Sequence, residues 1–148
     1  MNIKGYYPNR IYIMKIKYSL FLLLLTIFIS CSKDDESKLE GRWQGTTIES
    51  PRHRVQSDSL FWSFDRGVCE IQTLRASNPH YAEQIYANYL LEDNLVRISI
   101  PNNYLYLATQ NRYLDWTTPE RKFEIRELTN NSLKLSINDT IYSFRKYY

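Results

Sequence analysis

The chain has 148 residues and a formal net charge of +3. Four of its 19 basic residues and none of its 16 acidic residues precede Cys31, so the part from Cys31 onward carries 15 bases and 16 acids. This near-neutral balance excludes the basic field that attracts nucleic acids or anionic membrane surfaces, and the length suits a single domain with one modest core.

The N-terminal segment has the features of a secretory leader. Two lysines precede an apolar run, Tyr18–Ile29, and small Ser30 stands just before Cys31. A helix over that run would span roughly 18 Å, which is short of the ~30 Å hydrocarbon core that a membrane-spanning helix must cross. We therefore expect residues 1–30 to be a lipoprotein signal peptide, with Met14 as its true start.

The residues around Cys31 resemble the lipobox of bacterial lipoproteins, in which a small residue precedes a Cys that becomes lipid-modified and N-terminal. The residues that follow resemble the acidic export signal of Bacteroidota surface lipoproteins: Lys33, Asp34, Asp35 and Glu36. The resemblance implies a lipid anchor on Cys31, the membrane as a partner, and a surface-exposed place in the outer membrane. Several acyl chains on one Cys, at ~0.8 kcal/mol per buried methylene, would hold the protein there stably.

Lipidation of Cys31 leaves Cys69 without a disulfide partner. Cys69 lies in a run that alternates apolar and polar residues, which favours a small buried strand residue over a reactive thiol. A nucleophilic thiol needs a basic neighbour, and His53 and His80 both fall in segments that we expect to be loops.

Residues 31–38 are expected to form a flexible lipidated tether, and residues 39–148 a domain of short strands. Aromatic and β-branched residues alternate with a period of two along much of the domain. The predicted strands are Arg42–Glu49, Leu60–Asp65, Val68–Arg75, Glu83–Leu91, Leu95–Ile100, Phe123–Leu128, Leu133–Ile137 and Ile141–Tyr147.

The segments between these strands predict the order of the fold. Ser50–Ser57 is expected to be a solvated loop, Ser77–Pro79 to break a strand, and Arg66-Gly67 and Asn138-Asp139 to form hairpin turns. Tyr104–Arg121 has no clean period and is consistent with a short helix or a lid-like crossing. We predict an all-β fold, an antiparallel up-and-down meander of about eight short strands that closes into a small barrel, with an open, half-closed sheet as the alternative.

Two features at the ends of the domain resemble the lipocalins. Gly41-Arg42-Trp43 opens the first strand and Arg145 lies on the last, as in the G-x-W motif whose Trp packs under an Arg of the final strand. The resemblance implies that Trp43 and Arg145 close the barrel through a cation–π contact worth ~0.5–2 kcal/mol. More broadly, Leu39–Tyr148 resembles the small lipocalin-like lipoproteins of Bacteroidota, which implies a fold and not an activity.

The sequence offers little for catalysis or metal binding. The two histidines are isolated from each other and from acidic residues at ligand spacing, and there is no phosphate-binding loop or nucleophile elbow. Asp115 and Glu120 are a pair that chance alone can supply among 16 acids. We expect neither an enzyme nor a cofactor.

The aromatic residues lead to two hypotheses about function. Those on strands, such as Trp62 and Tyr89, are expected to pack in the core, whereas Tyr104, Tyr106 and Trp116 are candidates to line a ligand cavity or a lid. A barrel with a cavity would bind a small apolar or glycan ligand. A filled barrel with an exposed apolar patch would instead be a structural or protein-interaction module of the envelope, whose protein partner the sequence does not identify.

Overall fold

A computed structural model describes residues 31–75, 78–114 and 116–148. The predicted leader, with its start at Met14, lies outside the described residues. The chain divides into two compact units, Met1–Asp34 and Asp35–Tyr148, and the fold reported below is that of the second. None of the described helices has both the length and the apolar character needed to cross a bilayer.

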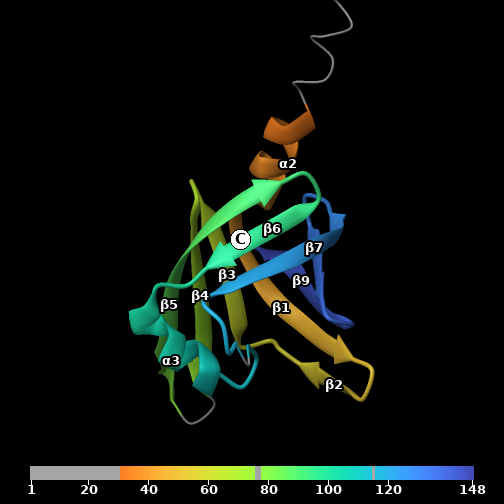
Figure 1. Ribbon diagram of the computed structural model, residues 1–148. Helices are drawn as coiled ribbons and strands as arrows, with labels where there is room; N and C mark the ends of the chain where they lie inside the picture. The colour runs from red at the N-terminus through yellow and green to blue at the C-terminus, as the bar shows by residue number, and fades with distance from the viewer. Residues whose placement is uncertain (1–30, 76–77, 115) are drawn as a thin grey trace, which may run out of the picture. The chain divides into compact units, whose positions relative to one another are not determined.

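Eight antiparallel strands form a closed barrel (Figure 1). Strands that follow one another in the barrel pair in antiparallel fashion, and the last strand returns to pair with the first from Arg42–Tyr147 to Glu49–Ile141. The predicted meander is therefore confirmed, and the sheet is closed rather than half-open. The strands are β1 (Gly41–Ser50), β3 (Leu60–Asp65), β4 (Val68–Arg75), β5 (Asn78–Glu92), β6 (Leu95–Ser99), β7 (Glu120–Leu128), β8 (Ser132–Ile137) and β9 (Thr140–Tyr147).

Three further elements accompany the barrel: α2 (Cys31–Leu39), β2 (His53–Gln56) and α3 (Asn102–Gln110). β2 pairs with the second half of β1 in a segment predicted to be a solvated loop. Its four residues are all exposed, so it carries no alternation that could reveal a strand. α3 and β2 lie toward the same end of the barrel (Figure 1).

α2 occupies the segment predicted from its sequence to be a flexible tether. Asp34 in the first turn and Lys38 in the last have the charges that the helix dipole favours, and Asp35 lies 3.5 Å from the Lys38 ammonium. Leu39 at the end of the helix is fully buried in the barrel core. Favourable charges at both ends of the helix and the burial of Leu39 therefore stabilise a regular helix in this polar segment.

Two hairpin turns have the backbone geometry that their sequences predict. Arg66 and Gly67 both have positive φ (44° and 82°), as do Asn138 and Asp139 (47° and 62°). Two consecutive residues in this region form the tight turn whose twist matches that of the flanking strands. Strand register on either side is set by these turns.

Aromatic side chains fill the barrel core. The Trp62 ring is fully buried, and its centroid lies 5.2 Å from that of Phe144, 5.4 Å from that of Phe123 and 6.2 Å from that of Trp116. Such ring pairs contribute ~0.5–1.5 kcal/mol beyond the apolar area that they bury. The centre of the barrel is thus packed with side chains, and the strand aromatics Trp62, Phe64 and Tyr89 are core residues.

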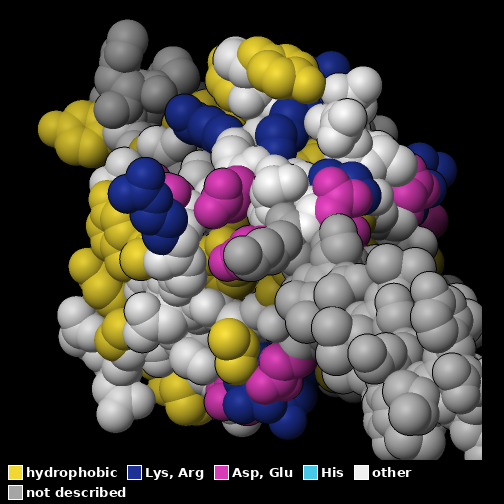
Figure 2. All heavy atoms as spheres, turned by 90° about the horizontal axis from the view of Figure 1, so that it is seen from above, with side chains coloured by type: hydrophobic (Ala, Val, Ile, Leu, Met, Phe, Trp, Pro, Cys, Tyr) yellow, Lys and Arg dark blue, Asp and Glu magenta, His cyan; other side chains and the backbone are white. Residues whose placement is uncertain are grey.

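The surface at one end of the barrel carries basic and acidic side chains interspersed with hydrophobic ones (Figure 2). Elsewhere on the surface, basic and acidic side chains form ion pairs such as Lys134–Glu127 and Arg54–Glu49. Such pairs are each worth ~0–1 kcal/mol, so they contribute less to stability than the aromatic core.

Candidate functional site

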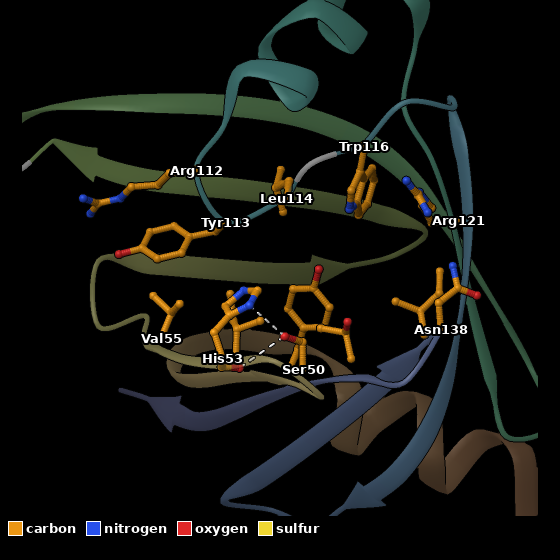
Figure 3. Close-up of a pocket in the computed structure, with 13 residues that line it drawn as sticks. Ser50, His53, Val55, Arg112, Tyr113, Leu114, Trp116, Arg121 and Asn138 are labelled. Atoms are coloured by element: carbon orange, nitrogen blue, oxygen red, sulfur yellow. Dashed lines mark hydrogen bonds between the residues drawn. The ribbon is translucent and has the colours of Figure 1, made fainter.

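An open pocket of about 280 Å³ lies at the end of the barrel where β1 ends and β9 begins (Figure 3). The segment after α3 runs along one side of it, and the β1–β2 hairpin lies opposite. The lining residues come from three parts of the chain that are distant in sequence: Ile48, Ser50, His53, Val55, Arg112, Tyr113, Leu114, Trp116, Arg121, Ile137, Asn138, Thr140 and Tyr142.

The side formed by the segment after α3 is held in place by a buried amide. Asn111 Nδ2 donates a hydrogen bond to Thr73 Oγ1 at 2.9 Å, and Asn111 Oδ1 accepts one from the Tyr113 N–H at 3.0 Å. Further along, the Thr109 hydroxyl donates to the Trp116 carbonyl at 2.8 Å. Trp116 is 1 % exposed and packs on Trp62, so this wall continues directly into the core.

Arg112 is the charged residue of this segment that lines the pocket. Its Nη2 donates to Ser59 Oγ at 2.6 Å, and its guanidinium lies 4.6 Å from the centroid of the Tyr113 ring. The Tyr113 hydroxyl in turn lies 2.8 Å from Ser59 Oγ. The exposed guanidinium is therefore oriented by a hydrogen bond and a stacked ring before any ligand arrives.

The opposite wall is the β1–β2 hairpin. Ser50 Oγ lies 3.0 Å from His53 Nδ1 and donates to the His53 carbonyl at 3.2 Å, which ties the two strands at the pocket edge. A Cβ added to Gly45 would lie 2.7 Å from the carbonyl oxygen of Ser57, so only glycine allows the return of the hairpin to pass this close to β1. Val55 of β2 is exposed at the rim.

The pocket combines an apolar interior with a basic and polar rim. Ile48, Leu114, Trp116 and Tyr142 are all buried. Arg112, Arg121 and His53 are the lining residues that carry or can take a positive charge, and the described lining residues include no Asp or Glu. The arrangement can hold a small molecule with an apolar part.

The three aromatic residues that were candidates for a ligand cavity or a lid lie in different surroundings. Trp116 contributes to the pocket. Tyr104 is half-buried and meets Tyr86 edge-to-face with ring centroids 6.1 Å apart, whereas Tyr106 is 72 % exposed on α3. Arg112 and Arg121 were not predicted from the sequence to line a site, because a charged residue in an irregular segment carries no periodic signal.

The cation over Trp43 is Lys146, and not Arg145 as the lipocalin resemblance implied. Lys146 Nζ lies 4.2 Å from the centroid of the Trp43 ring and donates to the carbonyls of Lys38, at 3.1 Å, and Glu40. Strand alternation explains the difference, because the neighbouring buried residue of β9, Phe144, shares a face with Lys146 while Arg145 faces outward. Arg145 donates instead to Gln44 Oε1, from Nε at 3.0 Å and from Nη2 at 2.7 Å.

Lys146 also ties α2 to the first and last strands. Trp43 Nε1 donates to the Leu39 carbonyl at 2.7 Å, so the Trp43–Lys146 pair contacts the last turn of α2 from two sides. Burial lowers the pKa of Lys146, and the nearby Glu40 carboxylate acts in the opposite direction. β1 and β9 do pair at this point, with Trp43 opposite Lys146 and Gln44 opposite Arg145.

The remaining residues singled out in the sequence do not assemble into a site. Cys69 is a buried free thiol whose pKa is raised by burial and, to a smaller extent, by the Glu70 carboxylate. Asp115 and the side chain of His80 lie outside the described residues. Among the residues that the structure describes, no group of three His, Cys, Asp or Glu side chains could hold a metal ion.

The proposed anchor segment is described only in part. Cys31 and Lys33 fall within α2, and their side chains lie outside the described residues. Asp34 and Glu36 are exposed on the helix, and Asp35 is half-buried.

Comparison with known proteins establishes the family. Residues 23–147 match the family model described as a lipocalin-like domain, and the chain therefore belongs to that family. The match spans both the barrel and the two strands that close it. No curated protein matches the chain.

Two solved structures have a similar fold. A lipocalin-like protein from Bacteroides uniformis ATCC 8492 is 22 % identical, with a TM-score of 0.68 over 74 % of this chain and 99 % of its own. An uncharacterized protein from Bacteroides eggerthii DSM 20697 is 28 % identical, with a TM-score of 0.61 over 74 % of this chain and 99 % of its own. The likeness to the first shows the fold alone.

Proposed function

We propose that this protein is a cell-envelope lipoprotein that binds a small apolar or glycan ligand in the pocket at the open end of its barrel. The observation that carries the proposal is the pocket itself, whose apolar interior is bounded by two walls that hydrogen bonds hold in place. The protein acts by binding rather than by catalysis. No cofactor is needed for this function.

The size of the pocket restricts the ligand. Pockets for drug-sized molecules measure roughly 300–1,000 Å³. The pocket at about 280 Å³ is just below that range, and the packed Trp62 cluster beneath it prevents a ligand from reaching the barrel centre. The ligand is thus a small molecule, or the end of a larger one, that contacts Trp116 and Tyr142 with its apolar face.

The sequence supports the cellular location. Cys31 stands at a lipobox-like site and the acidic residues after it match an export signal, so we place the domain on a lipid anchor at the outer membrane, facing outward. In the sequence, α2 begins at the Cys that would carry the anchor and ends two residues before the first strand of the barrel begins.

A structural or protein-interaction role is the second candidate. It is favoured by large apolar side chains that remain exposed, among them Tyr86 and Leu90 of β5 and Tyr106 of α3. Exposed apolar groups that gather on a protein surface are a feature of interaction sites. A protein partner would contact this outer face and leave the pocket unused.

Blocking the pocket by a substitution would distinguish ligand binding from the structural or protein-interaction role. Val55 lines its rim and is 38 % exposed, so Val55→Trp would extend an indole over the opening without disturbing the core. Val68→Trp is the matched control, because Val68 is also on a strand, is 46 % exposed and does not line the pocket. The measurement is calorimetric titration of the full chain, in a non-ionic detergent, with the neutral aromatic probe 2-naphthamide.

We expect V55W to weaken binding of the probe by about tenfold or more, and V68W to bind as the unchanged protein does, since a blocked apolar pocket forfeits most of the contact area. Equal binding by V55W and the unchanged protein, or no binding by either, would contradict the pocket as the functional site and favour the interaction module.

A further inference from the structure

The charged side chains among the described lining residues of the pocket are all basic. Arg112 and Arg121 lie at opposite ends of it in Figure 3, and His53 lies on the facing wall. The described lining residues contribute no carboxylate. This contrasts with the near-neutral balance of the chain from Cys31 onward, with 15 bases and 16 acids, so the positive rim is local to the pocket.

Arg112 differs from several other arginines of the barrel in what it contacts. Within the described part of the chain, some arginines have a glutamate partner at 3.1 Å or less: Arg54, Arg75, Arg97 and Arg126. No described carboxylate forms such a pair with Arg112, whose guanidinium is hydrogen-bonded to a neutral hydroxyl, Ser59 Oγ. A guanidinium has five N–H donors, so Arg112 keeps donors for a planar acidic group.

The position of Arg112 relative to the apolar lining defines the shape of a complementary ligand. Arg112 and Leu114 belong to one short segment, and Asn111 fixes that segment to Thr73. A ligand whose ring or short chain contacts Leu114 and Trp116 would place its polar end toward the rim. An acid at that end would meet an oriented cation, since Ser59 and Tyr113 already hold the guanidinium.

We infer that the ligand of this pocket is a small amphipathic anion, an aromatic or short aliphatic acid whose acidic group binds Arg112 at the rim while its apolar part lies against Leu114 and Trp116. This inference rests on the proposed function and names the chemical class of its ligand. Carboxylate and phosphate monoester share the chemistry that Arg112 recognises.

The test compares two probes that differ in charge and little in shape, 2-naphthoate and its neutral amide, 2-naphthamide. Each is titrated by calorimetry into the full chain in a non-ionic detergent at low salt. We expect the naphthoate to bind about tenfold more tightly than the amide, the ratio that one charge-assisted hydrogen bond supplies. Because the rim is exposed, the ratio should fall when the salt concentration is raised to 0.5 M.

Variants assign the preference to one side chain. Arg112→Gln should reduce the ratio to about twofold or less, and Arg112→Lys, which keeps the charge, should retain most of it. Arg54→Gln is the matched control, because Arg54 lies on the same hairpin as His53 but pairs with Glu49 and does not line the pocket. A phosphate-bearing analogue, 2-naphthyl phosphate, shows which acidic group is preferred.

The outcomes separate this inference from the proposed function. Equal binding of naphthoate and naphthamide by the unchanged protein would overturn the inference and leave the pocket as a site for neutral ligands. A ratio that R112Q leaves unchanged, or a loss of both probes in equal proportion, would overturn the role of the Arg112 charge. Failure of both probes to bind the unchanged protein would overturn the proposed function together with the inference.

Discussion

Replacing Lys146 by Met tests how the barrel is closed. The K146M variant keeps the length of the aliphatic side chain but removes the ammonium group over Trp43 and its hydrogen bonds to the carbonyls of Lys38 and Glu40. A cation–π contact contributes ~0.5–2 kcal/mol and each hydrogen bond about 1 kcal/mol. Burial of the charge opposes these gains, as the lowered pKa of Lys146 indicates. The expected net loss is about 2 kcal/mol of unfolding free energy.

The assay is urea unfolding of the unit Asp35–Tyr148, followed by tryptophan fluorescence and far-ultraviolet circular dichroism. For a domain of this size, about 2 kcal/mol corresponds to a fall in Tm of about 8 °C. Arg145→Met is the matched control on the adjacent residue. Arg145 is exposed and, among the described residues, its side chain hydrogen-bonds to Gln44, so R145M should change stability by no more than ~0.5 kcal/mol. A larger loss for R145M than for K146M would refute the reasoning, because it would show that the outward-facing guanidinium closes the barrel.

Three further predictions concern the thiols and the wall of the pocket. Because burial raises the pKa of Cys69, an aromatic disulfide reagent at pH 8 should modify this thiol roughly 100-fold more slowly in the folded unit Asp35–Tyr148 than in urea. Fast modification of the folded protein would contradict the burial of Cys69. Cys31→Ser should move the protein out of the membrane fraction of the producing cell, and membrane retention of C31S would rule out the lipid anchor. Asn111→Ala leaves Thr73 Oγ1 and the Tyr113 N–H without their partner and should cost about 2–3 kcal/mol in urea unfolding, whereas a cost below ~0.5 kcal/mol would mean that the amide does not hold the wall.

The sequence best predicts those strands in which apolar and polar residues alternate in step with buried and exposed positions. Leu60–Asp65 and Val68–Arg75 are strands with the predicted bounds, since Leu60, Trp62 and Phe64 point into the core and Arg66-Gly67 forms the turn between them. β2 could not be predicted in this way, because none of its residues is buried and its sequence therefore shows no alternation. β5 begins at Asn78 rather than at the predicted Glu83, since a proline at the start of a strand does not break it.

The site was less predictable than the fold, for a physical reason. Its lining residues come from the β1–β2 hairpin, from the segment between α3 and the start of β7, and from the β8–β9 hairpin. These parts are distant in sequence, and closure of the barrel brings them together. Trp116 could be recognised as an aromatic residue in an irregular segment. The orientation of the Arg112 guanidinium, in contrast, depends on its hydrogen bond to Ser59, more than 50 residues earlier in the chain. The prediction placed Arg145 over Trp43, whereas Lys146 occupies that position. Only the strand register decides between these two neighbours, because a shift of one residue reverses which face of the sheet a side chain occupies.

The most direct test of the account is to locate the bound probe on the protein. Backbone amide chemical shifts of the isotope-labelled chain would be measured during titration with 2-naphthoate. If the open-end pocket is the functional site, the largest changes fall on Ile48, His53, Leu114 and Thr140, which line it from three sides. Changes centred on Tyr86 and Tyr106 of the outer face, with the pocket residues unmoved, would contradict the account and indicate that the exposed aromatic surface is what the barrel presents.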